Sequence, residues 1–252
     1  MMQRNTFERI TPDHLNLTNS AEHNTLNLHK ARYHFAARHL RPGKVLDIAC
    51  GVGYGAYELL LHRGDDISLI IAVDISASAL EYARKRYYNE KILFIQEDAH
   101  IYYSRLRFNT IISLETIEHL PDPEKFVQRL WSMLSDKGVL IISVPVTLST
   151  DVNPYHLNDF TINSFRNFFK QSDMIEEDAL LQKQPYRFVD VMQRKGNRYS
   201  EIRKNLAAYY LSHPISFIKR MYSIMTDGFC NKYLTLAIRK QAVSGETLSG
   251  NK

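Results

Sequence analysis

The chain has 252 residues, 44% of them hydrophobic and 23% charged, which is ordinary for a globular protein with a substantial core. No apolar run approaches the roughly 20 residues of a membrane-spanning helix, and the first ten residues lack the apolar stretch of a signal peptide. The two cysteines, Cys50 and Cys230, have neither metal-ligand nor disulfide spacing. We therefore expect a cytoplasmic protein, and neither a disulfide scaffold nor a membrane-spanning one.

The net charge of +5 is distributed unevenly. Residues 183–240 contain twelve Lys or Arg and three Asp or Glu, so this segment carries +9 and the remainder of the chain carries −4. Basic segments attract phosphates, anionic lipids or nucleic acid, although a solvated basic face is their commonest explanation. The basic excess thus belongs to one late segment of the chain.

The predicted elements alternate along the chain. A first helix is expected over about 21–39, and Arg41-Pro42-Gly43 ends it. Apolar strands are expected near 44–49, 68–74, 91–96, 108–114, 138–145, 174–181 and 231–239, and helices near 55–63, 77–88, 123–134 and 161–170. Alternating strands and helices predict right-handed crossovers and a mostly parallel sheet, with ligands beyond the carboxyl ends of the strands.

The first strand runs into a glycine-rich turn. The segment Val45-Leu46-Asp47-Ile48-Ala49-Cys50-Gly51-Val52-Gly53-Tyr54-Gly55 places one carboxylate inside an apolar strand, and the second strand ends on Asp74. Glycines let the backbone approach a ligand closely, and an acidic residue at the end of the next strand can accept both hydroxyls of a ribose. The pairing predicts a cofactor that contains a nucleoside.

Two cofactor classes compete for this pattern. A dinucleotide fold usually carries G-x-G-x-x-G, whereas this chain has G-x-G-x-G and Asp47 within the strand. The segment resembles the first motif of class I S-adenosylmethionine (SAM)-dependent methyltransferases. That resemblance implies an α/β fold with a doubly wound, mostly parallel, seven-stranded Rossmann-like sheet. The resemblance covers about residues 20–182. We expect an N-terminal helical cover (1–43), a SAM-binding core (44–182), a basic helical insertion (183–231) that departs from the family pattern, the last core strand (232–240) and a flexible tail (241–252).

The same resemblance implies the contacts of the cofactor. Backbone groups around Gly51 and Gly53 would meet its amino-acid end, Asp47 its ammonium and Asp74 its ribose. Gln96-Glu97-Asp98-Ala99 resembles the family's adenine site. The full expected set is Asp47, Ala49, Gly51, Gly53, Asp74, Ile75, Asp98, Ala99 and Leu114. The alternatives are a loop cap for Asp98 and a helix N-cap for Asp74, a role for which Ser76 competes.

The segment after the fourth strand points to the acceptor. Ser113-Leu114-Glu115-Thr116-Ile117-Glu118-His119-Leu120-Pro121-Asp122-Pro123 resembles the branch that contains ubiquinone-pathway O-methyltransferases and many glycan methyltransferases. A hydroxyl is a poor nucleophile until its proton is removed, and an imidazole can remove it. His119, and His156 after the fifth strand, are therefore the candidate catalytic residues. The alternative for His119 is that it caps or packs the turn.

A metal site is a sharper hypothesis for the same residues. The spacing Glu115-x-x-Glu118-His119 with a later His156 resembles the divalent-metal site of small-RNA 3′-terminal 2′-O-methyltransferases. Two carboxylates and two imidazoles would suit Mg²⁺, Mn²⁺ or Zn²⁺. Alternatively, Glu118 caps a turn and Glu115 lines the methionine pocket.

The late basic segment contains two helical patterns, which His213-Pro214 separates. Ile215, Ile218 and Tyr222 give the second an apolar surface beside Lys219 and Arg220. Such an amphipathic pair would be a lid over the acceptor, a homodimer contact or a peripheral membrane contact. The lid is the simplest interpretation.

The predicted function is SAM-dependent O-methylation of a small-molecule or glycan-type acceptor. The alternatives are a metal-dependent RNA 3′-terminal 2′-O-methyltransferase, an N-methyltransferase and a non-catalytic SAM-binding partner subunit. We expect no DNA partner, and the absence of a recognised RNA-binding module and the local basic charge argue against RNA.

Overall fold

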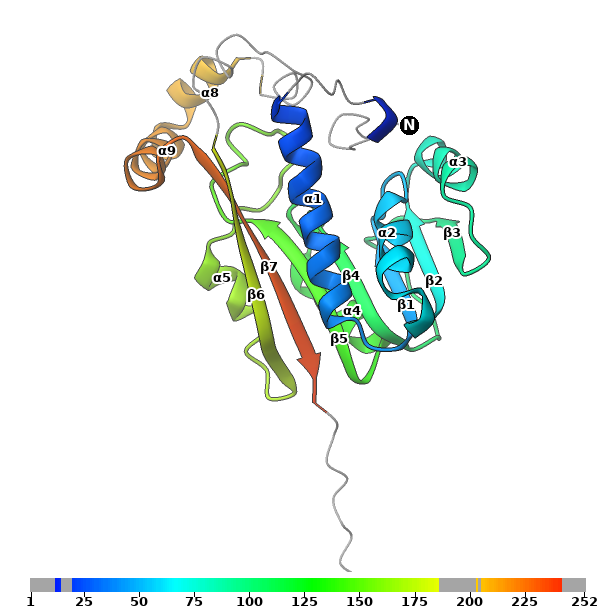
Figure 1. The fold of residues 1–252 in the computed structure, drawn as a ribbon. Coiled ribbons are helices and arrows are strands. Elements are labelled where there is room, and N and C mark those ends of the chain that lie inside the picture. The colour runs from blue at the N-terminus through cyan, green and yellow to red at the C-terminus, as the bar shows by residue number, and fades with distance from the viewer. Residues whose placement is uncertain (1–11, 15–19, 186–202, 204, 242–252) are drawn as a thin grey trace, which may run out of the picture.

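The computed structural model describes residues 12–14, 20–185, 203 and 205–241 (Figure 1). Its helices are α1 (Ser20–His39), α2 (Tyr54–Arg63), α3 (Ala77–Arg86), α4 (Pro123–Met133), α5 (Ile162–Asn167), α8 (Leu206–Ser212) and α9 (Pro214–Asp227). Its strands are β1 (Gly43–Ile48), β2 (Ile67–Asp74), β3 (Ile92–Gln96), β4 (Phe108–Leu114), β5 (Leu134–Pro145), β6 (Met174–Pro185) and β7 (Cys230–Lys240). Short 3₁₀ helices lie at Pro12–His14 (η1), Gly64–Asp66 (η2) and Ile117–His119 (η3).

The strands form one seven-stranded sheet in the order β3-β2-β1-β4-β5-β7-β6. Strands β1 to β5 pair in parallel, whereas β7 is antiparallel to both β5 and β6. The predicted seven-stranded, mostly parallel sheet is therefore confirmed. The β6–β7 hairpin is longer than expected, because its pairing continues to Pro185 opposite Cys230. Residues 183–185 and 230–231 thus belong to strands, although we expected them in the insertion.

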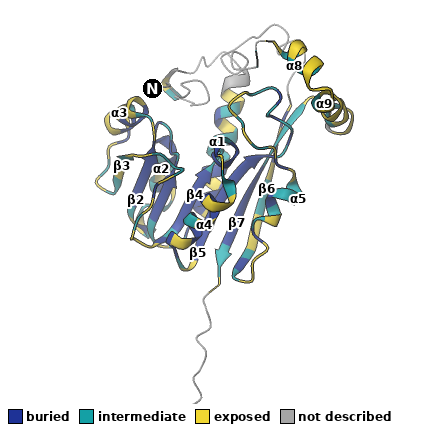
Figure 2. Ribbon diagram, turned by 180° about the vertical axis from the view of Figure 1, so that it is seen from behind, coloured by how far each residue is buried: buried dark blue, intermediate teal, exposed yellow. Residues whose placement is uncertain are grey.

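Alternating side chains of the central strands pack on opposite faces of the sheet. Val45 packs among residues of α1, α2 and α3, whereas Leu46 and Ile48 pack among residues of α4 and α5. This alternation follows from the two-residue period of a strand. Asp47 shares its face with Val45, so its carboxylate points toward α1 and α2. Figure 2 shows the strands as a buried layer beneath the helices.

Polar side chains cap two of the helices that follow strands, α3 and α4. Ser76 accepts a hydrogen bond from the Ala79 amide at the start of α3, and Asp122 accepts one from the Lys125 amide at the start of α4. Pro123 occupies the first turn of α4, where its missing N–H has no intrahelical partner to lose. The helices expected near 77–88 and 123–134 are confirmed, whereas the one expected near 161–170 is only α5.

Helices α8 and α9 lie beyond the end of the sheet where the parallel strands finish (Figure 1). The expected break at His213-Pro214 is confirmed, because Pro214 begins α9. A buried ion pair fixes α9 to the loop after β5: the Arg220 guanidinium lies 2.9 Å (Nε) from the Asp151 carboxylate and also donates to the Leu148 carbonyl. The Tyr210 hydroxyl of α8 donates to the same carboxylate at 2.6 Å.

Helices α8 and α9 are largely exposed (Figure 2), and several of their exposed residues are hydrophobic. The exposed hydrophobic residues of this helical pair are Leu211, Ile215, Phe217, Ile218, Met221, Tyr222, Met225 and, just beyond α9, Phe229. Within the described residues, no helix has both the length and the apolar character needed to cross a membrane. The rest of the expected insertion (residues 186–202 and 204) and the expected tail (242–252) lie outside the described residues.

Candidate functional site

The turn after β1 has an unusual backbone. Ala49, Gly51 and Gly53 have φ angles of 62°, 60° and 80°, all in the left-handed region. Only glycine adopts that region without cost, so Ala49 carries strain of about 1–3 kcal/mol. A Cβ placed on Gly51 would meet no described atom within 4 Å, whereas one on Gly53 would press against the Phe94 ring. Gly51 therefore faces open space at the carboxyl end of β1.

Asp47 lies directly below this turn and is 1% exposed. The Tyr33 hydroxyl of α1 lies 3.3 Å and 3.2 Å from its two carboxylate oxygens and donates to them. Burial raises the pKa of Asp47 to about 7, the Tyr33 hydrogen bond opposes that rise, and the nearby Asp74 charge adds to it. A cationic group placed beside Asp47 would restore its charged form.

The third glycine of the motif, Gly55, leaves space for the Tyr33 ring. A Cβ on Gly55 would overlap the Tyr33 ring, so the absence of a side chain lets the phenol reach Asp47. Tyr33 also packs edge-to-face on Tyr54 at a centroid distance of 5.9 Å. The expected cover helix thus supplies a side chain to the glycine motif itself.

Asp74 ends β2 and joins the two strand ends. Its carboxylate accepts hydrogen bonds from the amides of Gly51 and Ser76, both at 2.9 Å. The N-cap of α3 is Ser76, so the alternative role of Asp74 as that cap is wrong. The next residue, Ile75, is 40% exposed, which presents an apolar side chain at the edge of the sheet.

The remaining expected cofactor residues lie at the ends of β3 and β4. Asp98 accepts a hydrogen bond from the His100 amide at 2.8 Å, so its carboxylate does brace the loop. Ala99 is half-buried in the same loop, and Leu114 is the last residue of β4. The expected residues are therefore brought together along one edge of the sheet, the edge at which β1 to β4 end.

This edge fits the groups of SAM. A buried carboxylate suits an ammonium, a second strand-end carboxylate suits a diol, and an exposed isoleucine beside a polar loop suits an adenine. The open space in front of Gly51 admits the backbone approach that an amino-acid group requires. The observed donor set thus matches the cofactor that the sequence motif implied.

Glu115 begins the segment after β4, with a φ of 49°. Its carboxylate accepts from the Ser143 hydroxyl of β5 at 2.7 Å and lies 3.7 Å from the Arg32 guanidinium. Glu115 is therefore held by Ser143 and Arg32, and it does not join the other expected metal ligands.

The other three expected ligands come together. Ligand atoms of Glu118, His119 and His156 all lie within 4.8 Å of one another, and the imidazoles meet edge-to-face at 4.7 Å. Backbone hydrogen bonds cause this meeting, since the Glu118 carbonyl accepts from the amides of Leu157 (2.8 Å) and Asn158 (3.1 Å). Residues 37 positions apart in the chain, His119 and His156, therefore share one site.

The hydrogen bond of His119 fixes its tautomer. Its Nδ1 lies 3.1 Å from the Tyr155 carbonyl, which only accepts, so Nδ1 carries the proton. The Nε2 of neutral His119 is then the basic nitrogen, 4.0 Å from the Glu118 carboxylate. His156 is oriented through Nδ1, which lies 2.7 Å from the Ser149 hydroxyl. Both imidazoles are thus positioned by a second group.

Our sequence analysis missed Arg32 and Tyr33. Arg32 is 1% exposed, donates through Nε to Gln182 at 2.8 Å and stacks over Tyr233, and within the described residues its Nη1 has no hydrogen bond. The signal was available: Arg32 lies four residues before the buried Ala36, on the buried stripe of α1. A charged residue on an apolar stripe indicates a partner within the core.

Comparisons with known proteins identify the family of the chain. The family described as "Methyltransferase domain" matches residues 41–204. The "Probable S-adenosylmethionine-dependent methyltransferase Rv3030" of Mycobacterium tuberculosis is 26% identical over 177 residues, which cover 68% of this chain. The matched stretch spans only 61% of that relative's length. A ubiquinone biosynthesis O-methyltransferase of Histophilus somni is 28% identical, over 42% of this chain and 47% of its own.

Solved structures share the fold. The BH2331 protein of Bacillus halodurans C-125 has a TM-score of 0.64 at 17% identity, over 84% of this chain and 99% of its own. The N-methyltransferase NodS of Bradyrhizobium japonicum WM9, solved with S-adenosylhomocysteine (SAH), has a TM-score of 0.56 at 13% identity, over 84% of this chain and 87% of its own. With its sheet order, its glycine turn and a family match over most of its length, the chain belongs to the class I SAM-dependent methyltransferases.

Proposed function

We propose that this chain catalyses methyl transfer from SAM to a hydroxyl of a small-molecule or glycan-type acceptor. One observation carries the proposal: His119 and His156 meet at the same edge of the sheet as the glycine turn. Methyl transfer to an alcohol releases a proton, and an imidazole at this edge can receive it at neutral pH.

SAM supplies an electrophilic methyl group on a sulfonium. In the proposed arrangement Asp47 would hold its ammonium, Asp74 its ribose diol, and Ile75, Asp98 and Ala99 would flank its adenine. Gly51 and Gly53 would bring backbone groups to its amino-acid end. These residues bind and orient, so that an acceptor oxygen can approach in line with the bond that breaks.

Proton removal falls to the histidines. The Nε2 of His119 is basic when Nδ1–H donates to the Tyr155 carbonyl, and it would accept the hydroxyl proton as the oxygen–carbon bond forms. His156 shares that space, and the Ser149 hydroxyl orients it. The products are then the methyl ether, SAH and one proton held on an imidazole.

Metal assistance is a second candidate, because Glu118 joins the two histidines within 4.8 Å. One carboxylate and two imidazoles suit a divalent ion such as Mn²⁺ or Zn²⁺, with Mg²⁺ less suited to nitrogen ligands. The ion would lower the pKa of a bound hydroxyl. The four-ligand arrangement of the RNA-end enzymes finds less support here, since Glu115 is held by Ser143.

The kind of acceptor atom is part of the proposal. The relatives include an enzyme named for O-methylation, and the similar structures include an N-methyltransferase. The paired imidazoles favour oxygen, because a neutral amine acceptor needs positioning more than it needs a base. A partner subunit that only binds SAM would have no use for two oriented imidazoles.

The test begins with calorimetric titration of SAH. Wild type should bind it, and Asp74→Ala should bind it much more weakly. Mn²⁺ is then titrated into the SAH-loaded protein, with Glu118→Gln as the shape-matched control. One equivalent of Mn²⁺ that binds the wild type but not Glu118→Gln supports the metal-assisted candidate, and equal binding by the two proteins leaves the histidine as sole base.

An acceptor screen with SAM completes the test, with SAH formation as the readout. Nucleotide sugars and lipid-linked glycans are the first acceptors to try. With an active acceptor, His119→Asn or His156→Asn should slow turnover by about 10²–10⁴-fold while SAH still binds. Failure of SAH to bind the wild type would contradict the methyltransferase proposal. Full activity in both histidine variants would contradict the assigned base.

A further inference from the structure

We propose that His34, Glu58 and His62 form a second, separate metal site, which binds a divalent first-row transition ion such as Zn²⁺ between α1 and α2. One ligand atom from each residue lies within 4.8 Å of the other two. The three residues are on the outer surface of the helices, and none of them belongs to the expected catalytic or cofactor set.

The distances from the Glu58 carboxylate to the two imidazoles are close to the ligand-to-ligand distances around a bound zinc ion. The Glu58 Oε2 lies 3.8 Å from the His34 Nε2 and 3.7 Å from the His62 Nε2. Ligands at the usual Zn–N and Zn–O bond lengths of about 2.1 Å are separated by about 3.4 Å in a tetrahedron. A contraction of a few tenths of an ångström would therefore bring Glu58 to ligand spacing from each imidazole, and the ligand nitrogens of the two imidazoles lie within 4.8 Å of each other.

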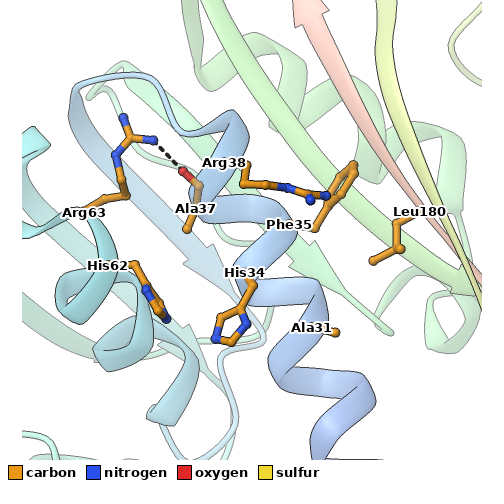
Figure 3. Close-up of a pocket in the computed structure, with 8 residues that line it drawn as sticks. All are labelled: Ala31, His34, Phe35, Ala37, Arg38, His62, Arg63 and Leu180. Carbon is orange, nitrogen blue, oxygen red and sulfur yellow. Dashed lines mark hydrogen bonds between the residues drawn. The ribbon is translucent and has the colours of Figure 1, made fainter.

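The helices place these side chains well. Glu58 and His62 are four residues apart on α2 and so share one face, the spacing with which helices often hold a metal. His34 comes from the facing side of α1, and its ring meets that of His62 edge-to-face at 4.5 Å. Figure 3 shows the two imidazoles on neighbouring helices. Both line a hollow of about 570 Å³.

The site is open to an ion. The side chains of His34 and His62 are 50% and 48% exposed, so an ion can enter and a water can complete its coordination. Lys30 engages the other carboxylate oxygen of Glu58 at 2.8 Å and orients Oε2 toward the imidazoles. The neighbouring Arg63 is bound to Asp66 and to the Ala37 carbonyl and is thereby held away.

Such an ion would clamp the cover helix to the core. His34 directly follows Tyr33, so the clamp would act beside the phenol that holds Asp47. The ligands come from two separate elements, and therefore the ion stabilises only the arrangement in which α1 is docked on α2.

The experiment titrates Zn²⁺ calorimetrically into the full chain that carries His156→Asn, which is called the parent below. This substitution disrupts the cluster of Glu118, His119 and His156, so that the ions bound there are not counted. We expect one equivalent to bind, and His62→Asn or His34→Asn to weaken that binding roughly 100-fold. His39→Asn is the matched control on the same helix, because His39 pairs with Asp178 away from the cluster. It should bind Zn²⁺ as its parent does.

A stability readout shows whether the ion clamps the helices. Excess Zn²⁺ should raise the Tm of the parent and of His39→Asn by roughly 5 °C or more and leave that of His62→Asn unchanged. The metal-free Tm of His62→Asn should match that of its parent, since the His62 side chain is 48% exposed. Equal Zn²⁺ binding in the parent and in both cluster variants would overturn the proposal, as would binding without any rise in Tm.

Discussion

The Tyr33 hydroxyl donates to the Asp47 carboxylate, at 3.2 Å and 3.3 Å from its two oxygens. A helix that precedes the core thereby holds the carboxylate at the base of the glycine turn. Burial raises the pKa of Asp47 to about 7, and the phenol partly offsets the rise because it stabilises the charged form. The charge on Asp47 therefore depends on both the pH and the docking of α1.

The first prediction concerns pH and cofactor affinity. An ammonium beside Asp47 lowers its pKa, so binding below pH 7 must release the proton that Asp47 carries in the free protein. We expect the affinity for SAH to fall by up to about tenfold per pH unit as the pH drops below about 7. Calorimetry between pH 6 and pH 8 measures this slope. If Asp47→Asn showed the same dependence of SAH affinity on pH, another titrating group would be its cause.

The second prediction is that Asp47→Asn stabilises the protein while it weakens cofactor binding. The folded-state pKa of Asp47 lies above its ordinary value of 3.8, so the stability that its neutral form provides is lost as the pH rises toward 7. At pH 8 the substitution should raise the free energy of unfolding by roughly 2–4 kcal/mol. Denaturant unfolding checks this, and at pH 5 the gain should shrink by more than half. Destabilisation at pH 8 would contradict the prediction.

The third prediction separates Tyr33 from its neighbours. Tyr33→Phe keeps the ring but removes the donor, so the pKa of Asp47 should rise by about one further unit. The pH midpoint for SAH binding should move upward by the same amount. Tyr54→Phe is the matched control, since Tyr54 is also buried and packs on Tyr33 at 5.9 Å. An equal shift in both variants would show that the phenol contact with Asp47 is not the cause.

The fourth prediction concerns the ion pair that fixes α9. Burial raises the pKa of Asp151, but Arg220 and Tyr210 outweigh it and hold the pKa below its ordinary value. Asp151→Ala leaves the Arg220 charge buried without this partner and should cost roughly 3–5 kcal/mol of unfolding free energy. The double variant Asp151→Ala, Arg220→Met should lose less than the sum of the losses in Asp151→Ala and Arg220→Met alone.

An exposed ion pair provides the control for that cycle. Lys125 is 77% exposed and pairs with Asp122 at 2.7 Å. Lys125→Ala should change the free energy of unfolding by less than about 1 kcal/mol. Denaturant unfolding of all four variants measures the coupling between Asp151 and Arg220. Strictly additive losses would mean that the pair does not anchor α9.

The sequence predicted the strands and the glycine turn well, because each rests on local rules: a two-residue apolar period, glycine at a left-handed φ, and a cap such as Ser76. It could not reveal that Tyr33 reaches Asp47, since that contact depends on how α1 packs across α2. The meeting of His119 and His156 was predicted only through a family resemblance. The two histidines meet because the Glu118 carbonyl accepts hydrogen bonds from two amides of the loop after β5. This is a tertiary contact that no sequence pattern predicts.

The third glycine of the motif has a consequence for related sequences. Gly55 leaves room for the Tyr33 ring, and it therefore depends on the cover helix and not on the cofactor. Across an alignment we expect positions 33 and 55 to covary, with bulk at 55 only where 33 is small or the helix is missing. The third glycine of a G-x-G-x-G motif would then indicate that an aromatic residue of an N-terminal helix packs against the motif.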